Sequence, residues 1–243
     1  MVPGWVNISV AGHEVDVLEP SSGPARFVLL YLHAVGLESL AENAVFTALL
    51  ERHRLACVAP RGARSWWADR ICSEFDDSVT PERFILDSLV PFMRKRWTVA
   101  NIGAFGISMG GQGAIRLGFK YPTLFPVVAG IASAFDYHEW YGQGSPIDAM
   151  YRTKEACRQD TAILHIQPNT YPPYIWFACD PNDAMWFRGN DRLHEKLQAI
   201  GIPHVVDLAT ECGGHSWGYF EHMAEHAIAF LVESLQKQSR RLM

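Results

Sequence analysis

The chain has 243 residues, of which 49% are hydrophobic and 19% are charged, so it can bury a large core as one domain spanning residues 1–243. Its formal net charge of −5 argues against nucleic acid and against an anionic membrane surface as partners. The sequence shows no apolar run of membrane-spanning length and no segment with the features of a secretion signal. The cysteines are odd in number and lack Cys-x-x-Cys spacing, which predicts reduced thiols, a cytoplasmic location and no zinc site.

Short apolar runs alternate with segments of helical periodicity along the chain. The runs predict strands, the first two paired as a hairpin, at Val6–Val10, Val15–Leu18, Phe27–Leu32, Leu55–Ala59, Val99–Phe105, Val127–Ala132, Tyr174–Ala178 and His204–Leu208. Apolar residues at helical spacing predict helices over Ser39–Arg54, Pro81–Trp97, Gly110–Phe119, Asn190–Ile200 and Trp217–Leu235. This alternation predicts an α/β fold with a mostly parallel central sheet and helices on both faces. Ligands of such folds bind beyond the carboxyl ends of the strands.

Residues 135–173 interrupt the alternation. The segment is rich in tyrosine, tryptophan, glycine and proline, and it has no clear period. Such a stretch is typical of an insertion rather than of a core element. We therefore expect a short lid-like insertion over the active site.

A Gly-x-Ser-x-Gly pattern occupies residues 106–110, between an expected strand and an expected helix. The pattern is typical of a nucleophile elbow, a strained strand-to-helix turn that lifts a serine hydroxyl clear of the sheet. Glycine on both sides of the serine lets two backbone segments pass closely without Cβ clashes. A serine that merely caps a helix would need no base or acid downstream. Ser108 is therefore a candidate nucleophile whose partners must be sought further along the chain.

His215 is the candidate general base, because it lies in the loop between the last strand and the last helix, at the carboxyl edge of the sheet. The acid is expected after the strand at Tyr174–Ala178, which gives the chain order Ser, Asp, His. Asp183 lies further out in that loop, where a carboxylate can meet the imidazole N–H. It is favoured over Asp180, whose neighbouring proline suits a turn. Asp207, in the last strand, is a weaker third candidate.

A serine nucleophile also needs N–H groups that stabilise the oxyanion formed during the reaction. The backbone N–H of Met109, next to the serine, is one expected donor. The other should come from the loop after an early strand, where Val35 follows Phe27–Leu32. His33, in the same loop, is expected to be structural rather than a second base.

Several aromatic residues fall in loops near the expected site. Four of them are candidate substrate-binding residues: Trp66, Trp67, Trp186 and Trp217. An aromatic wall would suit an acyl group, an aryl group or a stacked sugar ring. The alternative is that these side chains pack the insertion against the core.

Together these residues resemble the esterase-D-like branch of the α/β-hydrolases, which includes S-formylglutathione hydrolases and feruloyl esterases. The resemblance runs from about Phe27 to Leu235. It is carried by His33-Ala34-Val35-Gly36, residues 106–111, Tyr121-Pro122 with Phe125, Asp183, and Gly214-His215-Ser216-Trp217. The chain departs from the family pattern at Ala34, where glycine is usual, and at Asp180-Pro181, where Gly-Thr is more frequent.

The resemblance implies an α/β-hydrolase fold with Ser108 as nucleophile, His215 as base and Asp183 as acid, and no cofactor or metal. The implied reaction is hydrolysis of a small-molecule carboxylic ester through an acyl-enzyme intermediate. A serine peptidase of the prolyl-oligopeptidase type and a catalytically silent binding protein with this fold are the alternatives. The sequence is compatible with a homo-oligomer, and it does not identify the ester.

Overall fold

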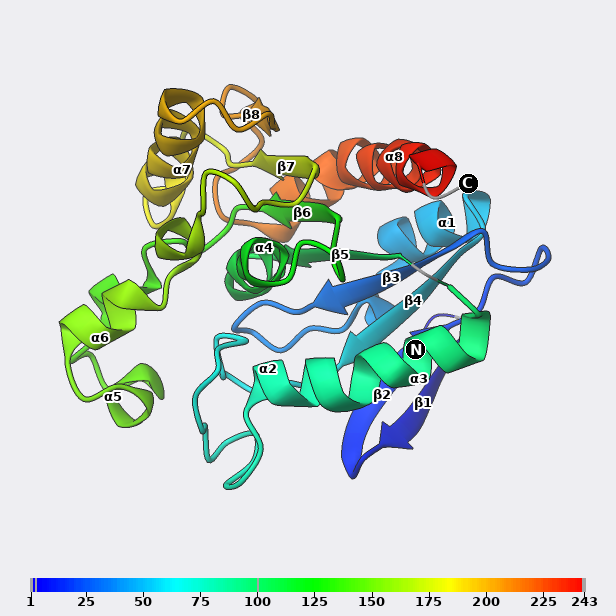
Figure 1. The fold of residues 1–243 in the computed structure, drawn as a ribbon, viewed down its shortest axis with the longest axis horizontal. Coiled ribbons are helices and arrows are strands. Elements are labelled where there is room, and N and C mark those ends of the chain that lie inside the picture. The colour runs from blue at the N-terminus through cyan, green and yellow to red at the C-terminus, as the bar shows by residue number, and fades with distance from the viewer. Residues whose placement is uncertain (1, 3, 100, 242–243) are drawn as a thin grey trace.

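The computed structural model describes residues 2, 4–99 and 101–241. Its strands form one eight-stranded sheet in the order β1-β2-β4-β3-β5-β6-β7-β8 (Figure 1). The strands are β1 (Trp5–Val10), β2 (His13–Leu18), β3 (Phe27–Leu32), β4 (Leu55–Pro60), β5 (Ile102–Ile107), β6 (Val127–Ile131), β7 (Tyr174–Ala178) and β8 (Val205–Asp207). Strand β2 is antiparallel to β1 and to β4, whereas neighbouring strands from β4 to β8 are parallel.

Helices cover both faces of the sheet, as expected when parallel strands are joined by crossovers. They are α1 (Ala44–Arg52), α2 (Pro81–Phe84), α3 (Val90–Trp97), α4 (Met109–Lys120), α5 (Ile147–Met150), α6 (Lys154–Gln159), α7 (Phe187–Ala199) and α8 (Trp217–Arg241). Helices α1 and α8 pack on one face, and α3, α4 and α7 pack on the other. In β3, for example, Leu29 and Tyr31 face the first layer, whereas Leu30 and Leu32 face the second. The structure confirms the predicted α/β fold.

The predicted helix over Pro81–Trp97 forms, but it contains a π-helical turn at Ile85–Leu89. The N–H of Val90 donates to Ile85 O instead of to the residue four positions earlier. Pro91 lies one residue further on, where its ring and missing N–H disturb the regular ladder. Ala100, in the strand predicted at Val99–Phe105, lies outside the described residues. In the part of the chain that the structure describes, no helix is both long enough and apolar enough to cross a bilayer.

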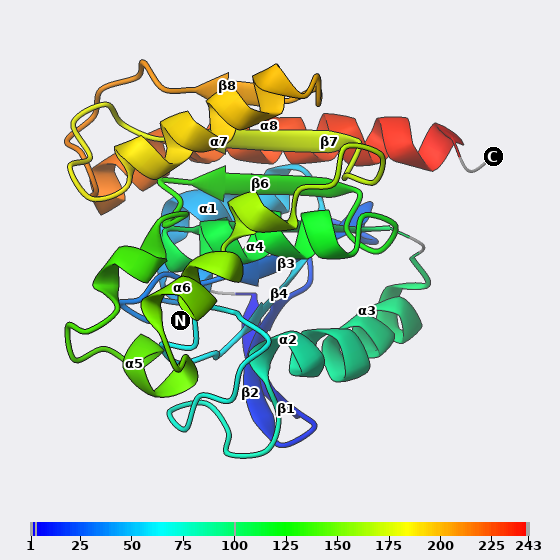
Figure 2. The ribbon, with the colours of Figure 1, turned by 60° about the vertical axis from the view of Figure 1, so that its left-hand side comes forward.

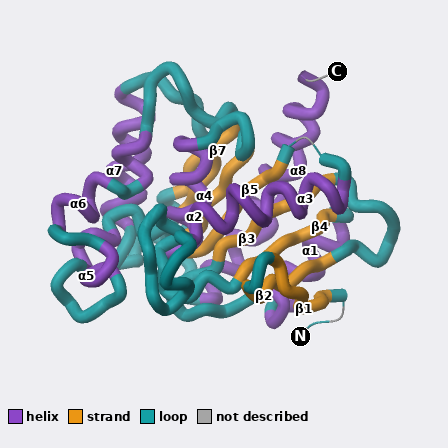
Figure 3. The backbone as a smooth tube through the Cα atoms, turned by 60° about the horizontal axis from the view of Figure 1, so that its bottom comes forward, coloured by secondary structure: helices purple, strands orange, loops and turns teal. Residues whose placement is uncertain are grey.

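The parallel strands point toward the end of the molecule where α5 and α6 lie, opposite α3 (Figure 2). Residues 135–173 form α5, α6 and two 3₁₀ turns at this end, rather than an irregular loop. The long loop between β4 and α2 lies beside α5 (Figure 3), and the two line a cavity of about 590 Å³.

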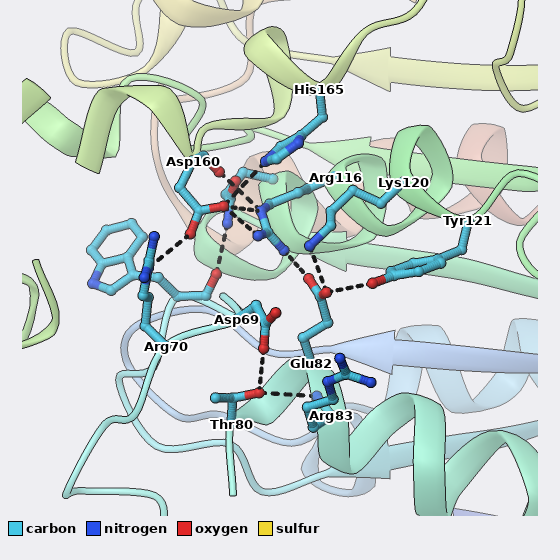
Figure 4. A network of polar contacts seen from close by, with 12 residues as sticks. Asp69, Arg70, Thr80, Glu82, Arg83, Arg116, Lys120, Tyr121, Asp160 and His165 are labelled. Atoms are coloured by element: carbon cyan, nitrogen blue, oxygen red, sulfur yellow. Dashed lines mark hydrogen bonds and ion pairs between the residues drawn. The ribbon is translucent and has the colours of Figure 1, made fainter. Parts of the chain in front are cut away.

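A network of buried charges fastens this segment to the layer below. Arg116 of α4 is 1% exposed and pairs with Glu82 of α2 and with Asp160, which follows α6 (Figure 4). Asp160 also accepts hydrogen bonds from Tyr151 (2.8 Å) and His165 (3.1 Å). Segment 135–173 is therefore packed onto α4, and its role as a lid stays a prediction.

Candidate active site

Ser108 occupies the turn between β5 and α4, with φ of 54° and ψ of −115°, a conformation that L-residues rarely adopt. A Cβ atom on Gly110 would overlap the carbonyl oxygen of Leu32, and one on Gly106 would overlap the carbonyl group of Gly110. The N–H of Ser108 donates to Ile131 O at 2.9 Å, which holds the strained turn against β6. These close approaches explain why glycine is needed on both sides of the serine.

The ring of His215 meets the serine from the loop between β8 and α8. Its Nε2 lies 3.1 Å from Ser108 Oγ, within hydrogen-bonding distance. The ring packs edge-on against Phe220 of α8, with 5.1 Å between ring centroids. The side chain is 18% exposed, so part of the imidazole still reaches solvent.

Asp183, in the loop after β7, completes a chain of hydrogen bonds. Its Oδ2 lies 2.7 Å from His215 Nδ1, and its Oδ1 accepts the N–H groups of Met185 and Trp186, each at 3.0 Å. With its proton on Nδ1, the neutral ring has a free lone pair at Nε2 that accepts the hydroxyl of Ser108. The structure thus brings together the predicted nucleophile, base and acid.

The other two aspartates considered for the acid lie elsewhere. Asp180 accepts backbone N–H groups from its own loop and from the loop that carries His215. Asp207 accepts bonds from Ala209 and Thr210 in its own loop. Of the three aspartates, Asp183 is the one whose carboxylate bonds the imidazole.

The expected oxyanion donors lie in the loops after β3 and β5. Met109 begins α4, so its N–H is among the first N–H groups of that helix and has no acceptor within the helix. Val35 lies three residues beyond Leu32, whose carbonyl oxygen lies against Gly110 near the start of α4. The two loops are therefore neighbours, and the role of Met109 and Val35 as donors stays a prediction.

His33 and Trp67 brace the loop that holds Val35. His33 Nδ1 donates to Ala34 O at 2.7 Å, and its Nε2 accepts the N–H of Gly62 at 2.9 Å. The indole N–H of Trp67 donates to His33 O at 3.1 Å. Burial lowers the pKa of His33 to about 4, so the ring is neutral at neutral pH. Both ring nitrogens bond the backbone, which is the environment of a structural residue.

Three of the four tryptophans expected to bind substrate pack in the core instead. Trp66, Trp67 and Trp186 are at most 3% exposed. Trp66 stacks on Tyr137, with 4.9 Å between ring centroids, and meets Trp186 edge-on at 6.4 Å. The structure places these three side chains in the core, which favours the packing alternative, and their contact with substrate stays a prediction. Trp66 and Trp186 pack against Trp140 of segment 135–173, whereas Trp67 packs against His33.

Trp217 differs from the other three because it is only half-buried. It follows His215 by two residues and packs edge-on against Phe220, with 5.6 Å between ring centroids. Its contact with substrate stays a prediction.

Sequence reasoning assigned no role to Cys179, which touches the acid. Its Sγ lies 3.7 Å from Asp183 Oδ2. Burial raises the pKa of this thiol, so it stays protonated and donates to the carboxylate. The position of Cys179 directly after a predicted strand was the one available signal.

A serine hydroxyl bonded to an imidazole, which is bonded in turn to a buried carboxylate, can be activated for attack on an acyl carbon. Asp183 is 1% exposed, so its charge acts on the imidazole with little screening by water. Among the described residues, no group of three or more His, Cys, Asp or Glu side chains is placed to hold a metal ion. The serine, imidazole and carboxylate are the groups that acyl transfer to a serine hydroxyl requires.

Comparison with known proteins agrees with this chemistry. Residues 28–230 match the Esterase family. The chain is 24% identical over 211 residues to an acetyl esterase of Caldicellulosiruptor saccharolyticus, covering 78% of this chain and 76% of that protein. The fold is similar to that of an S-formylglutathione hydrolase from Agrobacterium tumefaciens, with a TM-score of 0.78, 15% identity and 97% of each chain covered. It is also similar to a ferulic acid esterase, with a TM-score of 0.71, 17% identity, and 91% and 93% of the two chains covered.

The mostly parallel sheet with helices on both faces is an α/β-hydrolase fold, as in these solved structures. More particularly, the chain belongs to the Esterase family and is a hydrolase of the carboxylesterase type. The resemblance drawn from the sequence motifs is thereby confirmed.

Proposed function

We propose that the chain cleaves carboxylic esters in two steps, with Ser108 as the nucleophile. Its Oγ attacks the acyl carbon while His215 Nε2 accepts the hydroxyl proton, and Asp183 stabilises the imidazolium that forms. The N–H groups of Met109 and Val35 bind the oxyanion. The imidazolium then protonates the leaving alcohol, and a water activated by the same Nε2 hydrolyses the acyl-enzyme.

The observation that carries this proposal is the continuous chain of hydrogen bonds from Ser108 through His215 to Asp183, at 3.1 Å and 2.7 Å. Each residue comes from a different loop at the carboxyl edge of the sheet, where α/β folds bind ligands. The strained turn at Ser108 adds support, because such strain concentrates at functional sites.

We propose acetyl esters as the first substrates to examine, since the curated relative is an acetyl esterase. Trp217, beside His215 and half-buried, would contact the acyl or the alcohol part of the ester.

The test combines a fluorophosphonate probe with hydrolysis of p-nitrophenyl acetate. Ser108→Ala and His215→Ala should each abolish labelling and lower kcat/KM by about four orders of magnitude or more. Ser22→Ala, a change at an exposed serine, is the matched control and should leave the labelling and kcat/KM unchanged. Labelling that persists in His215→Ala would contradict the proposed base. Faster turnover of peptides than of esters would instead favour the peptidase alternative.

A further inference from the structure

Asp180 is a fully buried carboxylate, 0% exposed, at the end of β7. Its Oδ1 accepts the N–H of Asn182 at 2.7 Å. Its Oδ2 accepts the N–H of Cys212 at 2.6 Å and the N–H of Gly214 at 2.9 Å. One side chain therefore bonds the backbone of its own loop and of a second loop, whose donors lie 32 and 34 residues further along the chain.

The two loops are those that present the acid and the base. Residues 179–186 carry Asp183, and residues 211–217 carry His215. They touch directly, since a Cβ atom on Gly214 would lie 3.2 Å from Asn182 O. The hydrogen bonds of Asp180 join the two loops at this contact. Asp180 lies three residues before Asp183, whose carboxylate bonds the imidazole.

The base loop needs such an anchor because of its sequence. Gly213 and Gly214 precede His215 and have φ of 86° and 67°, in the left-handed region. Two consecutive glycines give the free loop many alternative conformations, so fixing the histidine costs conformational entropy. The bonds of Cys212 and Gly214 to Asp180 hold the backbone on both sides of Gly213.

Asp180 is held as a carboxylate. Burial alone would raise its pKa, but hydrogen bonds from the backbone N–H groups of Cys212, Asn182 and Gly214 outweigh burial and lower the pKa below its ordinary value. A charged acceptor makes stronger hydrogen bonds than a neutral one, which suits an anchor for a glycine-rich loop.

We propose that Asp180 is a positioning residue, which fastens the acid loop to the base loop and so keeps the His215 imidazole aligned with Asp183 and Ser108. The proposal rests on the proposed function. Asp180 is fully buried and bonds backbone N–H groups rather than the imidazole, so it would act through the backbone of residues 212–214.

The test uses Asp180→Ala, which removes both acceptor oxygens. We expect kcat for p-nitrophenyl acetate to fall by about 30- to 100-fold, because small misalignments of reacting groups have effects of this size. KM should change by less than about twofold, since the substrate contacts are untouched. The Nδ1 proton of His215, which bonds Asp183 at 2.7 Å, should give a downfield NMR signal in the wild type that broadens or disappears in the variant.

The matched control is Asp76→Ala. Asp76 also accepts two backbone N–H groups, those of Ser78 at 2.7 Å and Val79 at 2.9 Å, but it lies beside His13 of the β1–β2 hairpin, at the edge of the sheet opposite β8. It should keep the wild-type kcat and the His215 signal. If Asp180→Ala does not fold, Asp180→Asn takes its place. Its single amide oxygen cannot serve both the Asn182 donor and the two donors of the base loop, so a smaller loss of the same kind is expected.

Three results would overturn the proposal: wild-type kcat in the Asp180 variants, a lower kcat with the His215 signal intact, or an equal loss in Asp76→Ala. Failure of the proposed function looks different, because the wild-type Ser108 would then not react with a fluorophosphonate. Even in that case, the His215 signal in the Asp180 variants would still decide whether Asp180 holds the imidazole in place.

Discussion

At the scale of single residues, the strained turn at Ser108 depends on the absence of side chains around it. We predict that Gly110→Ala lowers the free energy of unfolding by about 3 kcal/mol, because its Cβ atom would overlap Leu32 O and force β3 and α4 apart. Gly218→Ala is a matched control, since Gly218 is likewise the second residue of a helix and its Cβ atom would meet only Ser216 Oγ, at 3.6 Å. Urea unfolding should show the control to be as stable as the wild type or more stable. Equal stability of the two variants would contradict the packing argument.

A second prediction at this scale concerns the buried ring of His33. Its pKa is about 4 in the folded chain, against an ordinary value of 6.5. Between these values the unfolded chain binds a proton that the folded chain does not, so the stabilisation present above pH 6.5 is lost as pH falls toward 4. His33 contributes a slope of up to about 1.4 kcal/mol per pH unit.

The measurement is urea unfolding of the wild type and of His33→Gln from pH 7.5 to pH 4.5. The free energy of unfolding should fall more steeply with falling pH in the wild type than in the variant, because glutamine does not titrate. His138 and His204, whose pKa values burial also lowers, contribute equally to both proteins and cancel in the difference. A difference that is constant with pH would be inconsistent with a neutral, buried His33.

At the scale of elements, the charge network around Arg116 joins α2, α4 and the segment that follows α6 (Figure 4). Arg116→Met would leave the carboxylates of Glu82 and Asp160 without their shared cation in the interior. We expect the free energy of unfolding to fall by about 3–5 kcal/mol in urea titrations. Arg52→Met removes an exposed pair with Glu225 instead, and its cost should be below about 1 kcal/mol. Similar costs for the two variants would show that the network contributes little.

The sequence predicted the elements better than it predicted their ends. All eight strands and the five long helices were expected, because period and apolar runs are local properties of the chain. The π-helical turn at Ile85–Leu89 was not expected, since it depends on how the backbone accommodates Pro91. The short helices of residues 135–173 were also missed, because tertiary packing rather than local period stabilises them.

At the scale of the whole molecule, the order of strands and helices placed Ser108, Asp183 and His215 at one edge of the sheet, so sequence reasoning could bring them together. Contacts between loops that are far apart in the sequence produce no recognisable pattern in either stretch of sequence. The bonds from Asp180 to the loop of His215 are of this kind, and so is the burial of Trp66. Which loops touch is decided by the packed fold, and a single sequence does not show it.

A second contact between distant segments involves the antiparallel β1–β2 hairpin, at the edge of the sheet opposite β8. Asp16 of β2 is fully buried, and its carboxylate accepts bonds from Asn7 (2.8 Å), from Ser39 (2.6 Å) and from Arg61 (2.7 Å). Ser39 follows the loop that carries Val35, and Arg61 follows β4. One carboxylate therefore joins the hairpin to two loops at the carboxyl edge.

We predict that Asp16→Ala lowers the free energy of unfolding by about 3 kcal/mol, because it leaves Ser39 without its buried partner and Arg61 without its counterion. Asn7→Ala removes only the bond from the partly exposed side of the hairpin, so it should cost about 1 kcal/mol. Urea unfolding of both variants checks the difference. If Asp16→Ala lowers the free energy of unfolding no more than Asn7→Ala does, the prediction is contradicted. The backbone hydrogen bonds of the sheet would then hold the hairpin, and the loops at the carboxyl edge would be fixed without the Asp16 carboxylate.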